Sequence, residues 1–357
     1  MTNDLIRRDH SAIILWLAAC AVLVAMMVMI GGYTRLSGSG LSITVWKPIH
    51  GIIPPLTDSA WREEFVAYQQ SPQYLKINKG MSLDEFKTIF WPEYIHRLIG
   101  RITGAAFFIP LVIFAVRESF SVRFSLRLLG IFGLGALQGV IGWLMVKSGL
   151  VNDPQVSALR LALHLSVAFA LLAMLIWAVM DLRDAAPLDL PASCKKDYKI
   201  WFFALCLQII FGALMAGTHA GLVYNTWPDI NGQFLPDGLL KQPWYENLTL
   251  IQLTHRNLAV LVAGGFLFWW YYYRHYVKDN HLGKVCGWVA LLIALQFALG
   301  VLTLLHQAPL TLAWMHQTVA LLLFIIAVIL MHKLCHRDTG QNNTRFRSFE
   351  WLDPKIR

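Results

Sequence analysis

The sequence predicts an all-α integral membrane protein, in which eight transmembrane helices form two tandem, pseudo-symmetric four-helix bundles. Composition is the first reason, because 57% of the 357 residues are hydrophobic and only 14% are charged, unlike a soluble globular chain. The second reason is that apolar runs long enough to cross a bilayer, about 20 residues each, recur eight times. They cover residues 12–33, 93–116, 128–147, 158–180, 200–218, 249–272, 286–305 and 312–334.

The first apolar run follows Arg7 and Arg8 and so resembles a signal peptide at its start. It contains no Ala-x-Ala cleavage site, and it continues directly into residues 31–35, Gly-Gly-Tyr-Thr-Arg. We therefore expect this run to stay in the protein as its first transmembrane helix.

Lys and Arg residues predict the orientation of the helices. If the N-terminus is cytoplasmic, the three inner loops carry three, four and three of these residues in turn, whereas the matching short outer loops carry only Lys147 and Lys241. Positively charged loops remain on the cytoplasmic side, so both termini are expected there. The formal net charge of +9 then fits contact with anionic lipid of the bilayer, and no nucleic-acid partner is expected.

An internal repeat divides the chain. Residues 93–97, Glu-Tyr-Ile-His-Arg, align with residues 252–256, Gln-Leu-Thr-His-Arg, and residues 39–42 align with residues 220–223. Each half contains an even number of predicted spans, so both halves enter the membrane in the same direction. The predicted organisation is an N-terminal unit over 1–184, a cytoplasmic linker over 185–198, a C-terminal unit over 199–340 and a cytoplasmic tail over 341–357.

A long first outer loop, residues 34–92, distinguishes the N-terminal unit. It is too long for a structureless connection, and helices are predicted over 59–70 and 83–91. The second of these begins with a capping box of Ser82 and Glu85. Its apolar side predicts a surface helix that lies on the membrane as a lid over the nearby site.

Four histidines form two pairs at matching places in the two halves, His96 with His164 and His255 with His316. A single transmembrane histidine often does no more than hydrogen-bond a neighbouring helix. Four of them at matched depth favour two pairs of axial ligands to heme iron. Zinc or copper would need further cysteine or carboxylate ligands at the same level, and no Cys-x-x-Cys-His motif for covalent heme attachment occurs.

Arginines accompany these histidines. Arg97 and Arg256 each follow a histidine directly, while Arg101 and Arg160 lie within about one turn of the same level. Two interpretations remain open for them. The side chains either snorkel to the membrane interface, or they pair with heme propionates, which need charge-assisted donors.

Glu93 is the predicted catalytic residue. It lies three residues before His96 and therefore shares its helix face, where a carboxyl group suits proton transfer. The alternative is a helix-capping carboxylate that follows Pro92 in the first turn. The second half has Gln252 at this place, which cannot ionise. The difference suggests that one half performs chemistry and the other carries electrons.

The chain resembles the heme A synthases of aerobic respiratory chains over nearly its whole length. The matching strings lie at residues 31–36, 39–42, 46–48, 54–55, 80–82, 85–87, 90–91, 96–101, 220–228, 255–256 and 312–317. The resemblance implies oxidation of the C8 methyl of heme O to a formyl group through a hydroxymethyl intermediate, giving heme A for cytochrome oxidase. It also implies heme O as substrate on His96 and His164, a heme b on His255 and His316, and Glu93 as the essential carboxylate.

Residues 34–92 contain no cysteine, so the chain resembles the class without a cysteine pair in that loop, typical of proteobacteria and mitochondria. The resemblance implies the bacterial cytoplasmic membrane, or the mitochondrial inner membrane in a eukaryote. It suggests a heme O synthase as supplier, homo-oligomers, and an electron acceptor that the sequence does not identify. The alternatives are an electron-transfer cytochrome b with two permanent hemes, and a heme carrier that performs no chemistry.

Overall fold

The computed structural model describes residues 2–45, 50–117, 120–183, 190–239, 241–277 and 281–335. This part of the chain is helical, apart from its connections. The helices are α1 (Thr2–Leu36), α2 (Asp58–Gln69), α3 (Pro72–Lys76), α4 (Leu83–Arg117), α5 (Val122–Ser148), α6 (Ala158–Leu182), α7 (Ala192–Thr218), α8 (Leu248–Val277), α9 (His281–Leu305) and α10 (Leu310–Cys335). Two short 3-10 helices, η1 (His50–Ile52) and η2 (Ala220–Leu222), lie between them.

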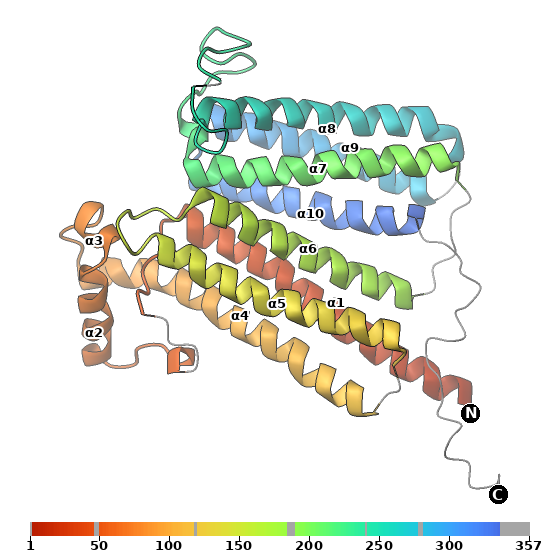
Figure 1. Ribbon diagram of the computed structural model, residues 1–357, viewed down its shortest axis with the longest axis horizontal. Helices are drawn as coiled ribbons and strands as arrows, with labels where there is room; N and C mark the ends of the chain where they lie inside the picture. Colours follow the sequence, from red (N-terminus) through yellow and green to blue (C-terminus); the bar gives the residue numbers. More distant parts are fainter. Residues whose placement is uncertain are drawn as a thin grey trace, which may run out of the picture.

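Eight of the described helices, α1 and α4 to α10, are long and apolar enough to cross a membrane, which confirms the predicted spans. They run side by side in two groups (Figure 1), with α1, α4, α5 and α6 in one group and α7 to α10 in the other. The helices α4, α6, α8 and α10 all begin at the end of the bundle opposite the N-terminus. The four histidines follow soon after these starts, so the fold places all of them toward one end.

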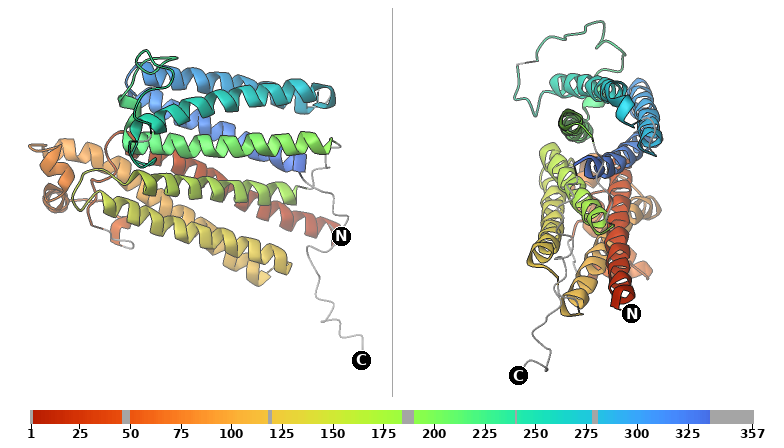
Figure 2. Two further views of the ribbon diagram at one scale, coloured as in Figure 1. Left: turned by 45° about the horizontal axis from the view of Figure 1, so that its top comes forward. Right: turned by 90° about the vertical axis from the view of Figure 1, so that its right-hand side faces the viewer.

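Helix α10 joins the two groups. Its residues belong to both apolar cores: Phe324 lies in the core of the first group, and Leu323 lies in the core of the second. The ring centroids of Phe324 and Phe169 of α6 are 4.7 Å apart, at an interplanar angle of 83°. Figure 2 shows α10 beside α1 in the end-on view, and the two helices are in contact. The histidine pairs are therefore set in one continuous bundle.

A buried ion-pair network joins the groups at the opposite end from the histidines. Asp181 of α6 accepts a hydrogen bond from Arg127 of α5 at 2.5 Å, and its other oxygen lies 2.7 Å from Nε2 of His332 of α10. His332 is fully buried. Because a charge buried without a partner is costly, this network favours a single packing position of α10 against α6.

The outer segment between α1 and α4 confirms one predicted helix and corrects another. The predicted helix over 59–70 is α2. Ser82 and Glu85 form the predicted capping box, in which the Ser82 amide donates to Glu85 Oε2 at 2.8 Å and the Glu85 amide donates to Ser82 Oγ at 3.3 Å. Residues 83–91, however, are the first turns of α4 and continue through Pro92 into the membrane span. The prediction of a separate lid helix on the membrane surface is therefore wrong.

The reason is a protein partner for the apolar side of this segment. Phe86 and Phe90 are buried against Trp61 and Tyr68 of α2. The ring centroids of Trp61 and Phe90 are 4.9 Å apart and those of Tyr68 and Phe86 are 5.0 Å apart. Aromatic pairs in this distance range stabilise each other beyond simple burial. The first turns of α4 therefore stand above the span and carry α2 with them.

The ends of the helices differ from the ends of the predicted apolar runs. Helix α7 begins at Ala192, so residues 192–198, expected in the linker, are helical. The connection between α1 and α4 covers residues 37–82, because α1 ends at Leu36 and α4 begins at Leu83. Hydropathy marks only the lipid-facing part of a helix and misses polar turns at its ends. Residues 184–189 of the linker and the tail over 341–357 lie outside the described residues.

Candidate functional site

Each of the four histidines packs directly on a glycine of a neighbouring helix. The Cβ atom of an alanine at the glycine would lie 2.8–3.1 Å from the nearest ring atom, which is too close for a side chain. The pairs are Gly31 of α1 with His96 of α4, Gly142 of α5 with His164 of α6, Gly212 of α7 with His255 of α8, and Gly300 of α9 with His316 of α10. An alanine would force the imidazole to move at Gly31, Gly142 and Gly300, and would press on it more mildly at Gly212.

All four histidines line one cavity of about 1780 Å³, which we call the shared cavity. Pockets for a single drug-sized ligand measure roughly 300–1,000 Å³, so this cavity has room for more than one large ligand. His96 and His164 line it from α4 and α6, and His255 and His316 line it from α8 and α10. The structure brings all four histidines to the wall of one cavity, and their pairing as ligands stays a prediction.

A glutamine stands beside three of the four rings. It lies four residues before the glycine, and its Nε2 is 3.3–3.5 Å from Nε2 of the histidine. The contacts join Gln138 to His164, Gln208 to His255, and Gln296 to His316. At His96 the corresponding position is Met27. The spacing Gln-x-x-x-Gly is readable in the sequence, but its contact with the histidines appears only in the structure.

The donor set fits heme better than a metal ion held by protein alone. Nδ1 of His164, of His255 and of His316 is buried and has no hydrogen-bond partner among the described residues. Within the described part of the chain, no group of three or more His, Cys, Asp and Glu side chains is placed to hold a metal ion. Two imidazoles on an apolar wall suit a macrocycle that supplies the other ligands itself.

Glu93 is 3% exposed and lines the shared cavity. Its Oε2 accepts hydrogen bonds from Ser42 Oγ at 2.7 Å and from the Ile43 amide at 2.8 Å. Its Oε1 accepts from Nε and Nη2 of Arg97, at 3.1 and 2.6 Å. These four donors stabilise the carboxylate. Because α4 begins at Leu83, the alternative role of Glu93 as a cap in the first helical turn is wrong.

Gln252 occupies the matching place on α8 with the opposite hydrogen-bonding role. It is fully buried, and its Nε2 donates to the Tyr224 carbonyl at 2.8 Å. Arg256 donates to the same carbonyl at 3.0 Å and to the Asp229 carbonyl at 2.8 Å. Glu93 accepts hydrogen bonds from the outer segment that follows α1, whereas Gln252 donates a hydrogen bond to the outer segment that follows α7. The second half therefore has no anion at this place.

The predicted propionate partners have different surroundings. Arg97, Arg101 and Arg256 line the shared cavity. Arg97 is bound by Glu93 and by the Ile43 carbonyl, and Arg256 by loop carbonyls. Arg160 is exposed, donates to the Leu144 carbonyl at 2.6 Å, and is not among the residues that line the cavity. Sequence reasoning gave no role to Arg35, which does line it.

The fold and the cavity together define a polytopic helical membrane protein, with two pairs of histidines facing one apolar cavity and a buried carboxylate beside one pair. The profile of the family described as COX15-CtaA, cytochrome oxidase assembly protein, matches residues 14–328. The chain belongs to this family.

Curated relatives cover nearly the whole chain. The heme A synthase of Nitrosospira multiformis is 44% identical over 332 residues, which is 90% of this chain and 93% of that protein. The heme A synthase of Parvibaculum lavamentivorans is 42% identical over 331 residues, covering 91% and 95%. That of Rhodopseudomonas palustris (strain BisA53) is 42% identical over 352 residues, covering 95% and 96%. The family resemblance seen in the sequence is confirmed.

Proposed function

We propose that this protein is a heme A synthase, a membrane oxidoreductase that converts heme O to heme A for cytochrome oxidase. One observation carries the proposal: among the described residues that line the shared cavity, Glu93 is the single carboxylate, and it lies beside only one of the two histidine pairs. A cavity with two similar histidine pairs and one carboxylate has one place where a carboxylate can accept a proton from the substrate. The relatives named heme A synthase support the same reaction.

The two histidine pairs have different tasks in this proposal. His96 and His164 hold heme O as substrate, and His255 and His316 hold a heme b. When bound, heme b supplies a redox centre that takes up electrons one at a time and passes them to an external acceptor. The four glycines leave room for the imidazoles, and Gln138, Gln208 and Gln296 contact three of the rings at Nε2, so these residues would orient the rings that hold the hemes.

Glu93 serves the reaction as a proton acceptor. Oxidation of a methyl group to a formyl group removes protons as well as electrons, whichever molecule supplies the oxygen. Ser42, Ile43 and Arg97 hold the carboxyl group in one position by hydrogen bonds, so it has a fixed place at the cavity wall from which to accept a proton. Arg97 balances the charge of the carboxylate and leaves Arg101 as a propionate partner for the substrate.

The remaining parts of the proposal concern organisation and partners. We place the two ligand pairs in tandem four-helix units over 1–184 and 199–340, with both termini in the cytoplasm of a bacterium and the chain in its cytoplasmic membrane. The sequence repeat supports the tandem units, and the charge of the inner loops supports the orientation. A heme O synthase supplies the substrate, and the chain forms homo-oligomers.

The leading alternative is an electron-transfer cytochrome b with two permanent hemes. It requires two equivalent sites. The replacement of Glu93 by Gln252 in the second half argues against it, because a relay has no use for a buried, hydrogen-bonded carboxylate at one site alone.

The test is heme extraction from the protein expressed together with a heme O synthase. Wild type is expected to yield heme B together with heme A or its hydroxylated precursor. Glu93→Gln is expected to yield heme B and heme O, with heme A formation reduced about 100-fold or more. The matched control is Glu85→Gln, which removes an exposed carboxylate from the start of the same helix. Heme B alone in wild type and in Glu93→Gln would overturn the synthase in favour of the relay.

A further inference from the structure

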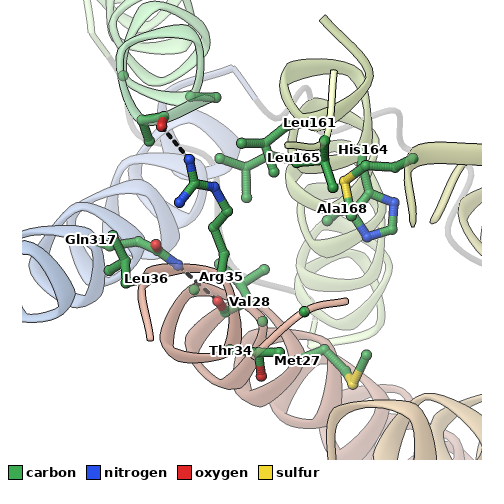
Figure 3. Close-up of a pocket in the computed structure, with 18 of the residues that line it drawn as sticks. Met27, Val28, Thr34, Arg35, Leu36, Leu161, His164, Leu165, Ala168 and Gln317 are labelled. Carbon is green, nitrogen blue, oxygen red and sulfur yellow. Dashed lines mark hydrogen bonds between the residues drawn. The ribbon is translucent and has the colours of Figure 1, made fainter. Parts of the chain in front are cut away.

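Arg35 reaches from one group of helices into the other. It lies in the last turn of α1, and its Nη2 donates to the Ala216 carbonyl of α7 at 2.6 Å. The same nitrogen is 3.3 Å from Nε2 of His219, which follows α7. Figure 3 shows the side chain pointing away from α1 toward that carbonyl, across the space between α6 and α10.

The position of Arg35 relates to both ligand pairs. Arg35 lies four residues, about one helical turn, beyond Gly31, which faces His96. Its acceptor Ala216 lies four residues beyond Gly212, which faces His255. Both helices run toward the end of the bundle where the histidines lie. The guanidinium group is therefore about one turn farther out than both ligand levels, between the two sites.

The guanidinium group has donors to spare. Nε of Arg35 is buried and has no hydrogen-bond partner among the described residues, and an arginine carries five N–H donors. No described carboxylate forms an ion pair with it. A cation on the wall of an apolar cavity is costly unless an anion joins it. The unused donors point to an anionic ligand.

His219 does not supply a second cation here. Partial burial, together with the positive charge of Arg35, lowers the pKa of His219 below its ordinary value of 6.5. The ring is therefore neutral at pH 7 and can accept an N–H from Arg35. The positive charge at this place belongs to Arg35 alone.

Fewer cations are available to bind heme propionates beside the C-terminal histidine pair than beside the N-terminal pair. The described cations that line the shared cavity from α4 and α5 are Arg97, Arg101 and Lys147, whereas α7 to α10 contribute Arg256 alone. Arg256 already donates to two loop carbonyls. A heme carries two propionates, and each is best bound by a charge-assisted donor. The tip of Arg35 lies against α7, in the group that lacks the second cation.

We infer that Arg35 binds a propionate of the heme held by His255 and His316, so that this site takes one of its cations from the opposite half of the chain. The inference rests on the proposed function, since it requires heme in the C-terminal site. Binding of that heme then ties α1 to α7 through the propionate. Arg35 acts as a cofactor-binding residue here and takes no part in the oxidation.

The test compares heme B with its dimethyl ester, in which both propionates are uncharged. Full-length protein is stripped of heme and titrated with each form, as wild type, Arg35→Gln, Arg35→Lys and Arg274→Gln. Arg274 is a matched control, because it also donates to a backbone carbonyl, that of Tyr271 at 2.8 Å, and it is not among the residues that line the cavity.

Wild type is expected to favour heme B over the ester, and Arg35→Gln to lose about tenfold or more of that preference. Arg35→Lys keeps part of it, and Arg274→Gln keeps all of it. The preference is the ratio of the affinities of one protein for heme B and for the ester. A general loss of protein stability lowers both affinities alike and so leaves this ratio unchanged. The midpoint potential of the bound heme is expected to fall in Arg35→Gln, because the lost cation favoured the reduced form, and ~59 mV corresponds to a tenfold change in a one-electron couple.

The outcomes separate the two proposals. A wild-type protein that binds no heme overturns the proposed function. A wild-type protein that binds heme, beside an Arg35→Gln variant with the same preference and the same midpoint potential, overturns the role of Arg35 and leaves the synthase intact.

Discussion

His96 and His255 are held alike but have different neighbours. Each ring packs on a glycine, and each is followed by an arginine that donates to the carbonyl of an outer segment, Arg97 to Ile43 at 2.8 Å and Arg256 to Tyr224 at 3.0 Å. The sequence repeat that aligns residues 39–42 with residues 220–223 puts these two carbonyls at equivalent positions. The glycine and the arginine contacts are thus the same around His96 and His255.

Three substitutions set the two surroundings apart. Glu93 stands where the second half has Gln252, Ser42 where it has Val223, and Met27 where it has Gln208. The first two create and hold a buried carboxylate. The third leaves His96 without the amide that contacts the other three rings. We infer that a few residues beside one ring convert a heme-holding frame into a reaction site.

Replacing one histidine at a time is expected to have the strongest effect on heme content. His255→Ala is expected to lose heme b and keep heme O on the other pair, because each site loses half of its axial ligands only when its own histidine is replaced. His96→Ala is expected to keep heme b and lose heme O and heme A. Extracted hemes, counted per chain, check this. Loss of both hemes in each variant would contradict two separate sites.

A smaller effect is expected from filling the space beside one ring. An alanine Cβ at Gly142 would lie 2.9 Å from Cε1 of His164. Overpacking of this kind costs about 1–3 kcal/mol, so Gly142→Ala is expected to weaken heme O binding about tenfold or more and to leave heme b in place. Gly135→Ala is the control on the same helix, since a Cβ there meets nothing within 4 Å. Equal heme O affinities in the two variants would show that the ring needs no such space.

A change at Ser42 is expected to have a weaker effect, through Glu93. Ser42→Val gives the first half the residue found at the matching place in the second half, and it removes one of the four hydrogen bonds to the carboxylate. Heme A formation is expected to fall about three- to tenfold, because one hydrogen bond to a charged group is lost, with heme content unchanged. Ser37→Ala, a hydroxyl that contacts Thr34 and Ser39 instead, serves as control. An unchanged rate of heme A formation would mean that Ser42 does not support Glu93.

The features that sequence reasoning predicted are local ones. The eight spans follow from runs of apolar residues, because a helix in lipid must be apolar along its length. The capping box of Ser82 and Glu85 involves residues three apart on one helix start, and the structure contains it. The two histidine pairs and the difference between Glu93 and Gln252 were also visible from the repeat alone.

Tertiary structure decided which way the side chains turn and what covers them. Phe86 and Phe90 were predicted to face the membrane surface, but α2 buries them. Arg97 is turned toward Glu93, and Arg160 toward Leu144 outside the shared cavity. Arg35 reaches a carbonyl 181 residues away in the chain. A hydrophobic pattern shows only whether a residue is favourable in lipid. These contacts depend instead on which helices become neighbours, and that arrangement is determined only when the whole bundle packs.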